Sequence, residues 1–293
     1  MTSTTPEPTK PWADAPLKLI TTPQFETGRT DIFATGATHM ALLHNSIFRG
    51  YNSIYQQSPN VKDVDKYDFI GYSLTWYKFV KSHHDDEEVS LFTKVEEVLD
   101  DKTIWAEIHK EHGMRTIALS YNSPPSSNFI GRYPCRLTAV LPPAAAFLPG
   151  LAEFEKYLTS LRSPKDFSGT ELQRIMSSFQ EPFETHFHSE ISTIAKLADH
   201  PNAPKSGSPE EVSASLTFKT WGKSTVTKAG TLDVVPFFLL NLDGTVEDGM
   251  WANWPPIPAP IKWGLVNIGG AYHNRWWKFA SCAGGKPRQL YAV

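Results

Sequence analysis

Cysteine is scarce in this chain, and its scarcity limits how the fold can be stabilised. Only Cys135 and Cys282 occur among 293 residues, too few for a disulfide framework or for a cysteine-rich zinc site. Such cysteine usage is typical of proteins kept in a reducing compartment. The chain is long enough to bury a substantial hydrophobic core. We therefore expect a cytoplasmic protein that folds without disulfide bonds.

Long apolar runs and clusters of basic residues are also missing from the sequence. No stretch approaches the roughly 20 apolar residues of a membrane span. The polar, proline-rich start MTSTTPEPTKPW lacks the apolar centre of a signal peptide. Lysine and arginine are scattered, and the net charge is −3. We predict neither a membrane nor a nucleic-acid partner, and the composition carries no signal for an oligomeric state.

Helical periodicity dominates the sequence from about Asp31 to His200. Apolar residues recur at steps of three and four, which indicates amphipathic helices around a common core. The pattern predicts a first helix from about Asp31 and further helices over residues 66–99, 103–112, 147–161 and 169–198. Residues 113–144 contain several prolines and a serine cluster. Because loops of that length are uncommon in a compact bundle, this stretch is interpreted as an insertion that splits the third helix.

The domain organisation follows from these patterns. Residues 1–28 are predicted to be disordered or extended, and residues 29–200 to form an all-α four-helix bundle with the loop insertion at 113–144. Residues 201–293 are predicted to form a short helix and an irregular cap rich in proline and tryptophan. That helix should begin at Pro209, with Ser208 as its cap, and end near Trp221. The run VVPFFLLNL in the cap is strand-like.

A histidine followed four residues later by a glutamate occurs on two of the predicted helices. These pairs are His83 with Glu87 and His186 with Glu190. At this spacing the two side chains share one face, about 5–6 Å apart, so both can reach a metal between helices. His44 lies in the apolar seam of the first helix and His112 on the predicted third helix. Two facing helices of this kind would enclose a two-metal site.

The types of candidate ligand restrict the metal. Imidazoles and carboxylates without thiolates suit iron, manganese or zinc, and several histidines with two bridging-capable carboxylates favour a dinuclear site. The Glu-x-x-His motif of ferritin-like di-iron bundles does not occur in this chain. A second pair, His84 and Glu88, lies one residue out of frame and is an alternative to, or an addition to, His83 and Glu87. His39, His109 and His188 fall outside the ligand set.

The order of these motifs resembles the hemerythrin-like family, also called the HHE cation-binding domain. The family has a histidine on the first helix, His-x-x-x-Glu on the second and fourth, and a histidine on the third. The stretches HNSIFRGYNSIY, SHHDDEEVSLF, FLPGLAEFEKYL and HFHSEISTIAKL resemble its fungal branch. One departure is that His112 is separated from Phe147, whereas family members have a phenylalanine three residues after that histidine. Removing 113–144 restores this spacing.

The resemblance implies a hemerythrin-like four-helix bundle that binds two non-haem iron ions, with manganese or zinc less favoured. The implied ligands are His44, His83, Glu87, His112, His186 and Glu190. It further implies dioxygen as a partner. One hypothesis is an oxidase or oxygenase that acts on a small organic substrate, and the other is a non-catalytic binder or sensor of oxygen, nitric oxide or iron. A third reading is a bundle without metal that serves as an interaction module.

Overall fold

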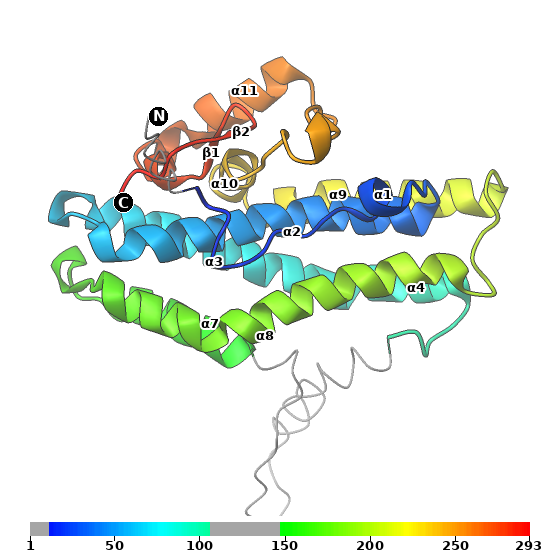
Figure 1. Ribbon diagram of the computed structural model, residues 1–293, viewed down its shortest axis with the longest axis horizontal. Coiled ribbons are helices and arrows are strands. Elements are labelled where there is room, and N and C mark those ends of the chain that lie inside the picture. The colour runs from blue at the N-terminus through cyan, green and yellow to red at the C-terminus, as the bar shows by residue number, and fades with distance from the viewer. Residues whose placement is uncertain (1–11, 106–146) are drawn as a thin grey trace, which may run out of the picture.

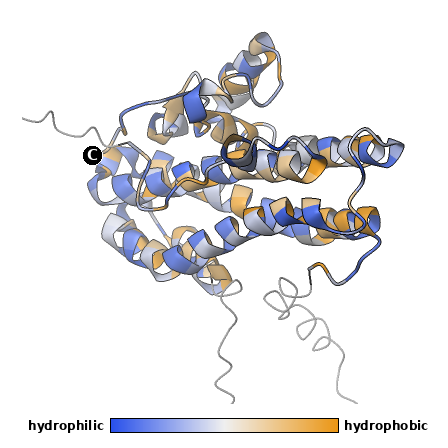
Figure 2. Ribbon diagram, turned by 45° about the vertical axis from the view of Figure 1, so that its right-hand side comes forward, coloured by the Kyte–Doolittle hydropathy of each residue, from blue (hydrophilic) through white to orange (hydrophobic). Residues whose placement is uncertain are grey.

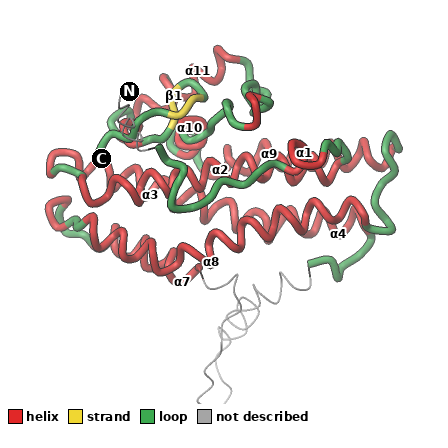
Figure 3. Tube along the Cα trace, viewed as in Figure 1, coloured by secondary structure: helices red, strands yellow, loops and turns green. Residues whose placement is uncertain are grey.

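Long helices lie side by side around one apolar core in the computed structural model, which describes residues 12–105 and 147–293 (Figure 1). Helix dominates these residues, as predicted for an all-α protein (Figure 3). Apolar and polar residues alternate along the long helices (Figure 2). The helices of the bundle are α2 (Ile32–Gln57), α3 (Lys66–Asp86), α4 (Phe92–Leu99), α7 (Leu148–Ser160), α8 (Gly169–Lys196) and α9 (Pro209–Ala229).

Helix α2 is the central element of the bundle. It begins where the Asp31 carboxylate accepts hydrogen bonds from the backbone N–H groups of Phe33 and Ala34, an N-cap arrangement. From Met40 to Ile54 every residue of α2 is buried, because α3, α8, α9 and α10 pack around it. The polar residues in this stretch must therefore find partners inside the protein, and His44 is one of them.

The predicted second helix is present between Lys66 and Leu99. It consists of α3, a π-helical turn over Glu87–Leu91, and α4. Thr103 to Trp105, the start of the predicted third helix, lie in irregular or turn conformation. The remainder of that helix, with His112, and the predicted insertion at 113–144 lie outside the described residues. Helices α7 and α8 lie where the sequence predicts helices, over residues 147–161 and 169–198.

The segment that precedes α2 in the chain is extended and runs along the outside of this helix. Residues 12–28 include α1 (Pro23–Thr27) and are fastened by two asparagines of α2. Asn52 accepts from the Leu17 N–H at 2.8 Å, and Asn45 accepts from the Ile20 N–H at 2.7 Å. The extended conformation agrees with the prediction for this part of residues 1–28, and residues 1–11 lie outside the description.

Helix α9 is longer than predicted. Its Ser208 cap accepts from the Glu211 N–H as expected, but the helix continues past Trp221 to Ala229. Thr225, Val226 and Ala229 are buried against the bundle, because α9 lies along α3 and α2. Burial of this second half supplies the stabilisation that the helix needs beyond Trp221.

The C-terminal lobe covers α2 and α3 at one side of the bundle (Figure 1). The strand-like interpretation of VVPFFLLNL is wrong, because Val234–Leu240 forms helix α10. Asp233 caps it, and Val234 to Leu239 are all buried, so this short apolar run has no alternation to reveal its conformation. The other regular elements of the lobe are α11 (Ala259–Asn267) and the antiparallel strands β1 (Cys282–Ala283) and β2 (Lys286–Pro287).

Two glycines allow the lobe to approach the bundle closely. A Cβ at Gly50 of α2 would lie 2.7 Å from the Phe237 ring, and a Cβ at Gly71 of α3 would collide with the Trp276 ring.

The remaining helical elements of the described residues are short 3-10 turns at Ser58–Asn60, Asp63–Asp65, Pro164–Asp166, Leu197–Asp199, Glu247–Gly249, Gly269–His273 and Trp276–Phe279. None of the helices in the described ranges is both long and apolar enough to cross a membrane.

Candidate metal centre

A buried group of histidines and carboxylates lies between α2, α3 and α8. The Nε2 atom of His44 is 2.9 Å from the Nε2 atom of His83, and His83 Nε2 is 2.8 Å from Glu87 Oε1. Glu190 of α8 approaches the same point, with Oε2 at 3.7 Å from His44 Nε2. The structure thus brings together four of the residues that the sequence singled out.

The spacing of these donor atoms is suited to one metal ion. Ligand atoms that lie about 2.0–2.2 Å from an ion, roughly 90–110° apart, are about 3–3.5 Å from one another. The donor atoms of His44, His83 and Glu87 all lie within 4.8 Å of one another, and all three residues are buried. This group could therefore hold a metal ion.

Burial keeps both histidines in the form that binds metals. Desolvation is the main reason why the pKa of His83 is lowered to about 4, while the negative charges of Glu190 and Asp86 oppose that shift. The pKa of His44 lies well below its ordinary value, first because of burial and then because His83 and His186 are close. At neutral pH both rings are uncharged, and a lone pair is available to a cation.

The two adjacent histidines of α3 point to different parts of the centre. His83 meets His44 of α2, whereas the ring of His84 lies 5.8 Å from the ring of His186 on α8. Phe147 packs against both of these rings, at 5.8 Å from His84 and 5.1 Å from His186. His83 therefore lies with His44, and His84 lies on the His186 side of the centre. The side chain of Glu88 lies outside the description.

A π-helical turn begins at Glu87. The N–H of Phe92 bonds to the Glu87 carbonyl, one residue further along than in an α-helix, and the normal helix resumes at Phe92. Such single widened turns are rare and occur frequently at functional sites. No local sequence pattern distinguishes this turn from the helix around it, so sequence reasoning did not identify it.

Aromatic side chains enclose the histidines. Phe187 lies 4.5 Å from His44 between ring centroids, and Trp221 of α9 lies 6.5 Å from His83. Phe147 covers the His186 side. These rings lower the local dielectric constant, which strengthens the interactions of any charge held there. The sequence did not indicate that Trp221 contacts the centre, because its helix was expected to end at this residue.

Of the histidines that the sequence raises as possible ligands, four remain, and two of them, His188 and His39, lie in the described residues. His188 is partly exposed and lies 3.1 Å from the Lys18 carbonyl, while His39 faces Trp254 at 6.0 Å between ring centroids. Neither belongs to the group formed by His44, His83 and Glu87. His112, the sixth predicted ligand, and His109 fall in the stretch that the structure leaves undescribed, so the predictions on them remain predictions.

Comparison with known proteins gives one relative along nearly the full length. The chain is 28% identical to a protein from Cryptosporiopsis sp. (strain 8999) named "Dimeric xanthone biosynthesis cluster protein R11". The match covers 99% of this chain and 97% of that protein, so it includes the C-terminal lobe as well as the bundle. No model of a known protein family matches the chain, and no solved structure matches it.

Proposed function

We propose that this protein binds two non-haem iron ions and activates dioxygen for the oxidation of a small organic compound. The observation that carries the proposal is the buried group of His44, His83 and Glu87, with Glu190 3.7 Å from His44. The donor set suits iron, and it also suits manganese or zinc. The motif order, which resembles the hemerythrin-like family, favours iron and a second ion on the His186 side.

The residues of the chain have distinct tasks in this proposal. His44 and His83 supply neutral nitrogen donors, and Glu87 and Glu190 supply oxygen donors with negative charge that balances a cation. Phe147 and Phe187 keep water away from the centre. Two ferrous ions bound there would supply two of the four electrons needed for full reduction of dioxygen, and the organic compound that is oxidised would supply the other two. His84 and His186 offer nitrogen donors on the other side of the centre.

The name of the relative supports a biosynthetic role. That protein is named for a dimeric xanthone biosynthesis cluster, and the similarity extends over 99% of this chain. A protein of this kind acting beside biosynthetic enzymes would meet small organic compounds. This context favours oxidation of such a compound over simple storage of a gas or a metal.

A second candidate function is the reversible binding or sensing of oxygen, nitric oxide or iron without catalysis. The burial of the centre favours it, because His44 is fully enclosed and the described ligands are all less than 5% exposed. Such enclosure suits a gas better than a large substrate.

Oxygen uptake over repeated cycles of anaerobic reduction distinguishes the two functions. We expect the reduced protein to consume oxygen irreversibly, and faster in the presence of its organic substrate. Full recovery of the oxygen in each cycle, with no product across a panel of metabolites, would establish the binder instead. His83→Gln should abolish uptake in either case, whereas His39→Gln should leave it unchanged.

A further inference from the structure

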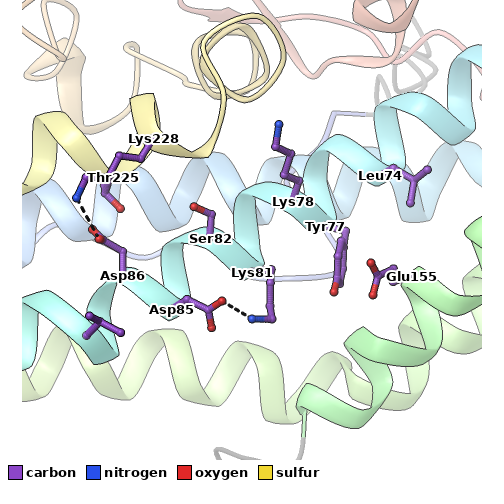
Figure 4. Close-up of a pocket in the computed structure, with 11 residues that line it drawn as sticks. Leu74, Tyr77, Lys78, Lys81, Ser82, Asp85, Asp86, Glu155, Thr225 and Lys228 are labelled. Carbon is purple, nitrogen blue, oxygen red and sulfur yellow. Dashed lines mark hydrogen bonds and ion pairs between the residues drawn. The ribbon is translucent and has the colours of Figure 1, made fainter.

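A groove runs along the outer face of α3, away from the candidate metal centre. It has a volume of about 690 Å³, within the range of small-molecule sites. Helix α3 and the π-helical turn supply its floor, α7 contributes Glu155, and α9 contributes Thr225 and Lys228 (Figure 4). The floor residues are Leu74, Tyr77, Lys78, Lys81, Ser82, Asp85, Asp86 and Val89. Most of these residues lie on the side of α3 opposite His83 and Glu87, whereas Asp86, three residues after His83, lies at the edge nearest the metal centre.

Two polar atoms at one end of the groove have no hydrogen-bond partner in the described part of the chain. Thr225 is only 2% exposed, and its hydroxyl is unsatisfied. Asp86 Oδ2 is buried and also unsatisfied, while Oδ1 lies 3.6 Å from Lys228 Nζ. Both side chains lie at the same end of the groove (Figure 4). Unsatisfied buried polar atoms are rare and costly, so this end of the groove is suited to a polar ligand group.

The charges along the groove favour a ligand without charge. Its three lysines all have acidic partners: Lys81 pairs with Asp85, Lys78 with Asp233 at 2.7 Å, and Lys228 with Asp86. Three acidic residues among the lining balance the three lysines. An anion would have to compete with these carboxylates for every lysine, whereas a neutral hydroxyl can accept from Thr225 and donate to Asp86.

The remaining surface of the groove is suited to an aromatic frame. Leu74, the ring of Tyr77 and Val89 supply apolar contacts, and the lysine side chains can lie over an aromatic face. Val89 is 70% exposed, so the groove is reached directly from solvent. A planar ring with a hydroxyl group would match both the polar end and the apolar floor.

We propose that this groove binds a neutral phenol, with the phenolic hydroxyl held between Thr225 and Asp86. None of the groove residues is among the candidate metal ligands, and Asp86 is the groove residue whose charge reaches His83. Binding of resorcinol to the full-length protein, measured by calorimetry, tests it. We expect resorcinol to bind more tightly than 1,3-dimethoxybenzene by about tenfold, since the ether oxygens cannot donate to Asp86.

A pair of matched variants locates the binding. Thr225→Val keeps the shape of the side chain and should weaken resorcinol binding about fivefold, the effect of losing one neutral hydrogen bond. Thr225→Ser retains the hydroxyl and should bind resorcinol as the wild type does. Melting temperatures of the three proteins verify that each is folded. Metal content, measured on the same samples, separates failure of this proposal from failure of the proposed metal centre.

Four outcomes would overturn the proposal. One is equal resorcinol affinity in wild type and Thr225→Val. Another is equal or tighter binding of 1,3-dimethoxybenzene, which would show that the hydroxyl contributes nothing. The third is tighter binding of 3,5-dihydroxybenzoate that Lys81→Met abolishes, which would make the groove an anion site. Absence of binding by all three compounds at millimolar concentration would also contradict the proposal.

Discussion

The two sides of the candidate metal centre differ in how completely the described residues build them. On the α2 side, His44, His83 and Glu87 place nitrogen and oxygen atoms 2.8–3.8 Å apart. On the α8 side, His84 and His186 meet as rings 5.8 Å apart, with Phe147 packed against both. The first side has the spacing for one ion without further residues. The second needs an additional ligand, which the sequence predicts to be His112.

The largest expected effect comes from replacing the histidine that joins the first side together. His83 lies within 3 Å of both His44 Nε2 and Glu87 Oε1. In His83→Gln we expect the metal content to fall by about one ion per chain, because the first side loses its central nitrogen donor. Elemental analysis of the purified variant measures this. Unchanged metal content would show that the first side is not the tighter one, and His39→Gln is the matched control.

The next largest effect is expected from acid, which should lower the stability of the folded protein through His83. Folding lowers the pKa of His83 from 6.5 to about 4, so between these values the unfolded chain binds a proton that the folded chain does not. Stability of the metal-free protein should therefore fall as the pH drops through this window, by about 3 kcal/mol from this residue. Urea unfolding at pH 7 and pH 4.5 tests the sign. His83→Gln should lose less stability than wild type over the same range, and an equal loss would contradict the assignment.

A smaller effect is expected on the second side. His84→Gln removes one of the two described nitrogen donors there and leaves His44, His83 and Glu87 in place. We expect partial loss of one ion, with the other retained. His188→Gln, which changes a partly exposed histidine bonded to the Lys18 carbonyl, should lose no metal. If His84→Gln loses as much metal as His83→Gln, the two sides form one coupled site rather than two sites of different strength.

Much of the bundle could be predicted from the sequence, because apolar spacing follows the period of the helix. Phe69, Tyr72 and Trp76 form such a stripe on the second helix, and all three are fully buried. The run Val234–Leu240 was misassigned for the opposite reason, since a short segment buried on every side has no periodicity. The far half of α9 was missed because its stabilisation comes from packing against α3, a tertiary contact.

The candidate site was predictable in its members but not in its arrangement. A spacing of four residues shows that His83 and Glu87 share a face, but it does not show which of His83 and His84 meets the first helix. That choice depends on the rotation of α3 against α2 and α8. The π-helical turn at Glu87 and the contact of Trp221 with His83 also arise from packing between helices, which a single sequence does not contain.

The central claim is that the bundle holds iron between its histidines and carboxylates. Elemental analysis of the wild-type protein, purified from iron-replete cells without chelators, tests it most directly. We expect about two iron ions per chain, and optical absorption that differs between the anaerobically reduced and the oxygen-exposed protein. A fully folded protein with no bound metal, whose stability and spectrum do not change when iron is added, would contradict the claim.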